Sequence, residues 1–166
     1  MGNVQLPNEA ERPSLRYDAQ VEANKHKDAY GAGVSSQLAL VNNSNKELVY
    51  HSDAHKSGRW EVKATTLSPN SAQGFLHAKS DSAAKGSTGA VTYTFTEKGS
   101  TYYVTFAWST PYSGGTNLGR VEFSSTPTQA SSILAAGFGG AKTSGNAKLS
   151  TLIGSTVSAN FTVGAS

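Results

Sequence analysis

The chain has 166 residues, no cysteine, 15% charged residues and a formal net charge of +3. This length can bury the core of one ordinary domain, and the absence of cysteine excludes disulfide bonds and thiolate metal sites. Lysine and arginine are scattered rather than clustered, so nucleic acid is not an expected partner. The chain lacks an apolar stretch of roughly 18 residues and shows no signal-peptide pattern, so we expect no membrane-spanning helix.

The first 33 residues are rich in charged side chains and are predicted as a polar N-terminal arm. Helical character is expected from about Ser14 to Tyr30, although Glu22 and His26 interrupt the apolar stripe. The residues that roughly share one helical face are Leu15, Ala19, Ala23 and Tyr30. Two glycines supply a flexible joint after this segment. Residues 34–166 are predicted as the β domain.

From residue 34 onward the apolar residues recur with a period of two, which is typical of β-strands. Candidate strands lie at residues 37–41, 47–51, 60–63, 74–78, 90–96, 102–108, 120–123 and 157–163. The first two are separated by a run of Asn and Ser and are expected to form a hairpin. In the fifth, Val91, Tyr93 and Phe95 face one way and the threonines face the other, which predicts a half-buried strand with a solvated face.

One segment interrupts the alternation and is predicted as a short helix. Ser125, Thr126 and Pro127 are typical of a helix start, residues 129–136 are apolar enough to pack, and Gly137 is a natural stop. About nine short strands with one helix predict an all-β fold. We therefore expect an antiparallel β-sandwich with one or two short flanking helices.

Motifs for catalysis or metal binding fail on inspection. His51 and His55 straddle a strand end and a loop, so they are not expected to share a metal ion. Residues 137–143 resemble a phosphate-binding loop, but Ala136 and Ala141 occupy its required glycine positions. No nucleophile elbow is present. We expect a protein that is not an enzyme and holds no cofactor or metal.

The remaining signal is a group of aromatic residues around the loop at 108–117. Alternation favours the core for Trp108, whereas Tyr112 stands in a Pro/Gly-rich loop where burial of a large ring is not automatic. Aromatic rings with polar tips suit membrane interfaces and the faces of sugars. The loop is therefore a candidate binding surface.

Several stretches, taken in order, resemble the actinoporin-like cytolysins and, more distantly, the fungal aegerolysins and fruit-body lectins of similar fold. The segments that carry the likeness are Leu-Val-Asn-Asn-Ser at 40–44, His-Lys-Ser-Gly at 55–58, Leu-Ser-Pro at 67–69, the glycine-led strand at 85–93, and Phe-Ala-Trp-Ser-Thr-Pro-Tyr at 106–112. The likeness spans roughly residues 38–163. It implies an actinoporin-like β-sandwich.

In that family a basic-Ser-Gly loop and a Ser-x-Pro-Tyr loop line a lipid-headgroup site. The resemblance thus implies a site made of Lys56, Ser57, Trp108, Ser109, Pro111 and Tyr112. Lys56 would meet a phosphate, and the Tyr112 ring would face a quaternary ammonium group.

The resemblance implies a soluble toxin that binds membrane lipid at its target, with pore formation and homo-oligomerisation on the membrane as further expectations. The alternative from another class is a lectin on the same scaffold, which would bind a cell-surface glycan through Tyr112 and Asn117. A third interpretation is a structural or effector protein that kept the fold and lost lipid binding, because a fold does not fix a function.

Overall fold

The structure is a computed structural model that describes residues 4–5, 13–80, 86–112, 117–138, 147–153 and 157–164. The strands are β1 (Val4–Gln5), β2 (Ser35–Asn42), β3 (Val49–Ser57), β4 (Arg59–Val62), β5 (Ser71–Ala78), β6 (Ser87–Glu97), β7 (Ser100–Thr110), β8 (Leu118–Ser124), β9 (Ala147–Ile153) and β10 (Val157–Gly164). The helices are α1 (Pro13–Tyr30) and α2 (Ala130–Ala136). The short helix predicted at 129–136 is therefore present, and helix also spans most of the predicted arm.

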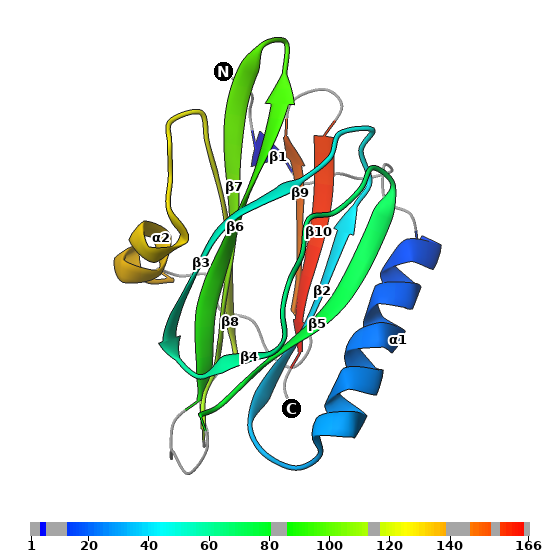
Figure 1. Ribbon diagram of the computed structural model, residues 1–166, viewed down its shortest axis with the longest axis vertical. Helices are drawn as coiled ribbons and strands as arrows, with labels where there is room; N and C mark the ends of the chain where they lie inside the picture. The colour runs from blue at the N-terminus through cyan, green and yellow to red at the C-terminus, as the bar shows by residue number, and fades with distance from the viewer. Residues whose placement is uncertain are drawn as a thin grey trace.

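The strands form two antiparallel sheets that pack face to face (Figure 1). The larger sheet has the order β1-β9-β10-β2-β5-β4, and the smaller has the order β3-β6-β7-β8. Each helix lies on one outer side of the sandwich, α1 against β2 and β5 and α2 against β3 and β6. The predicted all-β antiparallel sandwich with one or two flanking helices is confirmed, although α1, with 18 residues, is not short.

The predicted hairpin between residues 37–41 and 47–51 is wrong, because β2 and β3 belong to different sheets. The chain crosses between the sheets after β2, and the Asn42 side chain organises this crossing. Its amide donates to the backbone oxygen of Lys46 at 2.7 Å, and its oxygen accepts from the Ser44 hydroxyl at 2.7 Å. Leu48 then forms an isolated bridge with Leu67. The run of Asn and Ser is thus a crossover between sheets rather than a hairpin turn.

The core lies between the two sheets and follows the predicted alternation. Val91 and Tyr93 are fully buried, and Phe95 is 2% exposed. The opposite face of β6 is less solvated than predicted, since Thr92 is also fully buried. Its hydroxyl pairs with that of Thr105 at 2.6 Å, on the side of the sheet that α2 packs against. The pair of hydroxyls satisfies two buried polar groups at once.

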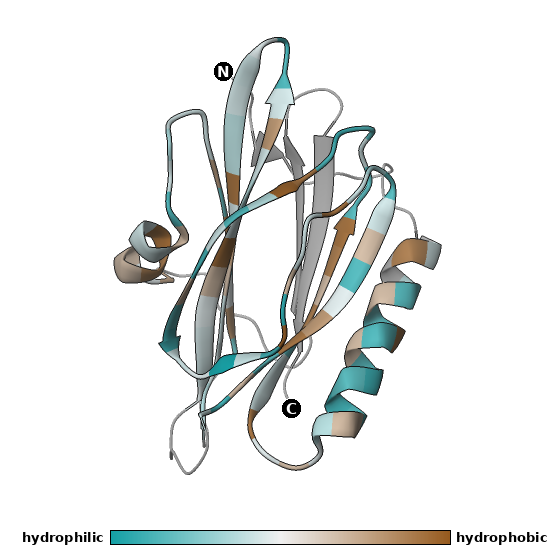
Figure 2. Cartoon of the chain, viewed as in Figure 1, coloured by the Kyte–Doolittle hydropathy of each residue, from teal (hydrophilic) through white to brown (hydrophobic). Residues whose placement is uncertain are grey.

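Helix α1 packs closely on the larger sheet through small side chains. Ala19 and Ala23 are buried, and a Cβ added to Gly74 of β5 would lie 2.2 Å from the Ala19 carbonyl oxygen. The carboxylate of Glu22 accepts a hydrogen bond from the Gly74 backbone N–H. Figure 2 shows hydrophilic residues over much of α1, yet the helix is docked by this close backbone approach. In the part of the chain that the structure describes, no helix is long and apolar enough to span a membrane.

Candidate functional site

The predicted site residues gather toward one end of the sandwich, shown at the bottom of Figure 1. The end of β3, the end of β7 and the connection at residues 31–34 lie at this end. Strand pairing aligns Ser57 of β3, Thr88 of β6 and Ser109 of β7 in one row. Because neighbouring strands lie about 4.8 Å apart, Ser57 and Ser109 are roughly 10 Å from one another. The hydroxyls of Thr88 and Ser109 are 2.9 Å apart, and Lys56 beside the row is exposed.

The loop that follows β7 presents Tyr112 to solvent, as the sequence predicted. Tyr112 is 47% exposed, whereas Pro111 before it is half-buried. A Cβ added to Gly86 would lie 2.1 Å from the Thr110 carbonyl oxygen and 3.0 Å from the Pro111 Cα. This close backbone approach needs glycine, and it supports the base of the loop under the exposed ring. The end of the sandwich thus carries the exposed ring of Tyr112 on a packed base.

The structure corrects the prediction for Trp108, which is fully buried and does not line this surface. Its ring lies 5.4 Å from that of Trp60 and 5.2 Å from that of His77, centroid to centroid. The reason is the alternation of β7, which directs Trp108 to the inner face and Ser109 to the outer face. Trp108 is therefore a core residue, and the other five predicted site residues remain candidates.

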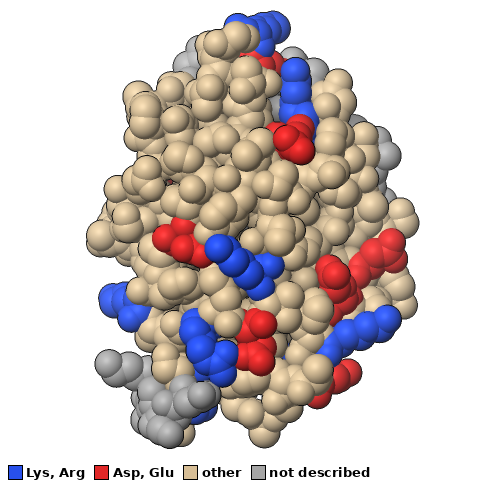
Figure 3. All heavy atoms as spheres, viewed as in Figure 1, with Lys and Arg blue, Asp and Glu red and all other residues tan. Residues whose placement is uncertain are grey.

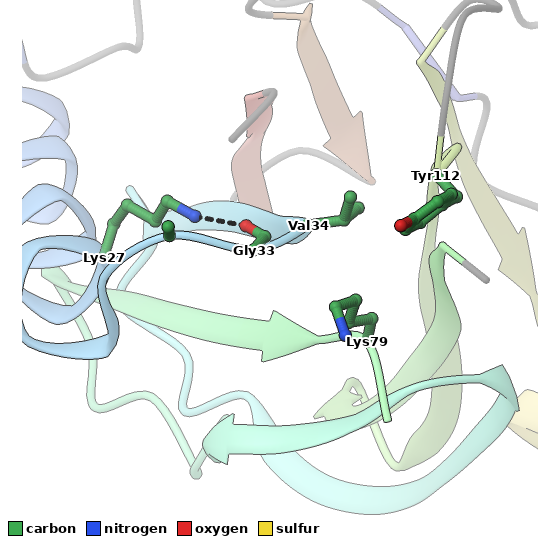
Figure 4. Close-up of a pocket in the computed structure, with 6 residues that line it drawn as sticks. Lys27, Gly33, Val34, Lys79 and Tyr112 are labelled. Atoms are coloured by element: carbon green, nitrogen blue, oxygen red, sulfur yellow. Dashed lines mark hydrogen bonds between the residues drawn. The ribbon is translucent and has the colours of Figure 1, made fainter. Parts of the chain in front are cut away.

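A pocket of about 510 Å³ next to Tyr112 was not predicted from the sequence. Its described lining residues are Lys27, Ala32, Gly33, Val34, Lys79 and Tyr112 (Figure 4). The pocket lies where the end of α1, the start of β2 and the end of β5 meet the loop after β7. These segments are far apart in the sequence, so local patterns could not place two lysines beside Tyr112. The one hint of this pocket in the local sequence is Lys27, which lies in the last turn of a helix that is followed by Gly31.

A buried chain of polar side chains, also unpredicted, joins the two sheets behind this end. Fully buried His77 places its Nδ1 2.7 Å from the Ser87 hydroxyl and its Nε2 2.8 Å from the His55 Nδ1. The Ser87 hydroxyl donates to the His77 carbonyl oxygen at 2.8 Å, so it accepts from the His77 Nδ1–H. The Ser36 hydroxyl lies 2.8 Å from that of Ser87 and donates to the Thr110 hydroxyl at 2.8 Å. The network therefore ties the last residue of β7 to the larger sheet, directly before the Tyr112 loop.

The electrostatics of this network favour a neutral His77 and a charged Asp53. Burial lowers the pKa of His77 to about 3, and the neighbouring His55 acts in the same direction. Partial burial alone would raise the pKa of Asp53, but hydrogen bonds from Tyr50 and Trp60 lower it overall. The Trp60 Nε1 donates to the Asp53 carboxylate at 2.7 Å. These groups stabilise the interior. Ser87 and His77 are fully buried, so a ligand in solution cannot reach them.

The two histidines singled out in the sequence lie in different surroundings. His51 packs edge-on against Tyr103 at 5.3 Å and lies 3.4 Å from the Gln129 amide, whereas the Nδ1 of His55 lies 2.8 Å from the Nε2 of buried His77. Among the described residues, no group of three or more His, Asp or Glu side chains is arranged to hold a metal ion.

The architecture defines the class as a two-sheet antiparallel β-sandwich with a helix on each outer side and an exposed aromatic loop at one end. A family model described as "Nakanori-like protein" matches residues 4–125, and the chain therefore belongs to the Nakanori-like family. Among solved structures, the chain is similar to one described as "lipid binding protein Nakanori", with a TM-score of 0.58 and 16% sequence identity. That match covers 87% of this chain and 78% of the other, and it shows a shared fold. No curated protein matches. The finer likeness to actinoporin-like cytolysins stays a prediction.

Proposed function

We propose that the protein binds the lipid surface of membranes through the end of the sandwich that carries Tyr112. The observation that carries this proposal is the exposed Tyr112 ring, set on a packed base in a fold shared with a lipid-binding protein. Tyrosine suits the membrane interface because its ring is apolar and its hydroxyl remains hydrated. The residues proposed to contact lipid are Lys56, Ser57, Ser109, Pro111 and Tyr112. Their proposed role is binding and not catalysis.

Charge assists attachment at this end rather than over a whole face. Figure 3 shows basic and acidic side chains interspersed among uncharged residues on one face of the molecule. Lys56 is exposed beside the Ser57–Ser109 row, and Lys27 and Lys79 line the pocket next to Tyr112. Two ammonium groups in one pocket with an aromatic ring, and Lys56 at the same end of the sandwich, suit a surface that carries phosphate oxygens. These residues would orient the protein with this end of the sandwich toward the membrane.

The lectin alternative uses the same surface with a different ligand. It relied on Asn117 as a polar contact, but this residue is only 7% exposed in the structure. A sugar bound at Tyr112 would therefore lack the expected contact with the Asn117 amide. This burial favours lipid over glycan as the ligand.

The proposal is tested by co-sedimentation of the wild-type protein with vesicles of phosphatidylcholine and of a total lipid extract, beside a glycan array. We expect sedimentation with at least one vesicle type and no retention on glycans. Binding to glycans without sedimentation would contradict the proposal and favour the lectin. Dye release, measured on the same vesicles, tests the finer proposal of a pore-forming, oligomerising toxin. Attachment without release would leave a lipid-binding protein that does not lyse membranes.

A further inference from the structure

The pocket between α1 and Tyr112 has the chemistry of an anion site. Its described lining includes two lysines and no carboxylate. Neither Lys27 nor Lys79 forms an ion pair with a carboxylate in the part of the chain that the structure describes. Figure 4 shows the Lys27 amino group and the Tyr112 ring on opposite sides of the pocket, with Lys79, which directly follows β5, between them. Two cations thus border one open space.

Lys27 is held in place before any ligand arrives. Its amino group donates to the Gly33 carbonyl oxygen at 2.6 Å and lies 5.2 Å from the centroid of the Tyr30 ring. Gly33 has a φ of +125°, a conformation that favours glycine. Partial burial lowers the pKa of Lys27 because the charged form loses hydration. An incoming anion would restore the lost stabilisation of that charge.

Lys79 is positioned by a backbone hydrogen bond. Its N–H donates to the Val34 carbonyl oxygen at 3.0 Å, which joins the end of β5 to the start of β2. The Lys79 side chain is half-buried, and Val34 contributes apolar surface to the same pocket. A fixed backbone at both lysines reduces the ordering cost of binding a small ligand.

We propose that the Lys27–Lys79–Tyr112 pocket binds a phosphate monoester, supplied at a membrane by the headgroup of an anionic phospholipid such as phosphatidic acid. A dianionic phosphate fits two separate ammonium groups because each one can donate to a different oxygen. The Tyr112 ring covers the side of the pocket opposite α1. The Ser57–Ser109 row lies on the outer face of the smaller sheet, so the pocket is a second contact beside that row. The lipid source rests on the proposed function, whereas the phosphate site itself does not.

The test compares charge-matched variants. Lys27→Gln/Lys79→Gln removes both pocket cations, and Lys25→Gln/Lys98→Gln removes two exposed lysines outside the pocket. Binding of soluble glycerol 3-phosphate is measured by calorimetry, and vesicle binding is measured on phosphatidylcholine with and without phosphatidic acid. We expect the pocket variant to lose roughly tenfold or more in affinity for glycerol 3-phosphate and for the phosphatidic acid vesicles. The control variant should lose less than about twofold.

The outcomes separate this inference from the proposed function. Equal losses in both variants, or none in the pocket variant, would overturn the phosphate site. If the wild-type protein binds no vesicles but binds glycerol 3-phosphate through the two lysines, the phosphate site is supported and the proposed membrane binding is contradicted. If it binds vesicles with no gain from phosphatidic acid and no affinity for glycerol 3-phosphate, membrane binding stands and the phosphate site fails. Because Lys27 also supports the turn at Gly33, Lys79→Gln alone decides the matter if the double variant does not fold.

Discussion

Trp108 and Tyr112 are four residues apart, yet one is fully buried and the other is 47% exposed. Trp108 is the last inward-facing aromatic residue of β7 and packs among the rings of Trp60, Phe75 and His77. Tyr112 follows the half-buried Pro111, beyond the last residue of the strand. Neighbouring aromatic residues in the sequence can therefore divide between the core and the exposed surface. The strand boundary at Thr110 is where that division falls.

The largest expected effect is the loss of the buried ring. Trp108→Ala should lower the free energy of unfolding by about 3–5 kcal/mol, because it leaves a cavity between the two sheets. Chemical denaturation monitored by circular dichroism measures this change. A loss below about 1 kcal/mol would contradict the assignment of Trp108 to the core.

The buried network behind the loop predicts a dependence of stability on pH. Folded His77 stays neutral down to about pH 3, whereas in the unfolded chain it takes a proton near pH 6.5. The unfolded state therefore binds more protons between these values, and His77 contributes a loss of stability as the pH falls from about 6.5 towards 3. The contribution should approach 1.4 kcal/mol per pH unit, roughly, within that window.

His77→Asn removes the titrating ring and should flatten this slope, although it also lowers stability at neutral pH. Denaturation curves collected from pH 7 to pH 4 provide the measurement, on the order of one curve per pH unit. His51→Asn is the matched control, because His51 lies outside the network and is exposed. An unchanged slope in His77→Asn would show that another group causes the acid sensitivity.

The docking of α1 predicts a smaller effect at Gly74. A Cβ at this position would meet the backbone of Ala19 and Ala23 at 2.2 and 2.4 Å, so Gly74→Ala should push the helix away from β5. We expect a loss of about 1–3 kcal/mol in urea unfolding, as for other overpacked contacts. If the variant is as stable as the wild type, α1 is not held by this approach.

The sequence predicted those features that depend on local periodicity. Period-two alternation placed Val91, Tyr93 and Phe95 inside, and the Pro127 region with Gly137 delimited α2. The exposed position of Tyr112 also followed from its local setting. Each of these predictions needed only a few neighbouring residues, and each is confirmed.

What the sequence could not predict depends on pairing between distant segments. The hairpin proposed for residues 37–51 failed because the choice of partner strand is set by the whole sandwich, not by the turn. Glu22 looked like an interruption of the helical stripe, yet it accepts a hydrogen bond from Gly74, which is distant in the sequence. The pocket required Lys27 and Lys79 to meet beside Tyr112, which only the tertiary fold arranges.

A role for Tyr112 in membrane binding is tested by measuring vesicle binding and melting temperature on one variant, Tyr112→Ala. We expect affinity for vesicles to fall between about twofold and thirtyfold, since an interfacial or cation–π ring contact contributes on the order of 0.5–2 kcal/mol. Stability should change by less than about 0.5 kcal/mol because the ring is exposed. Tyr17→Ala is the matched control, as Tyr17 is 69% exposed on α1 and outside the site, and it should bind as the wild type does. Unchanged vesicle binding in Tyr112→Ala, with unchanged melting, would contradict the account.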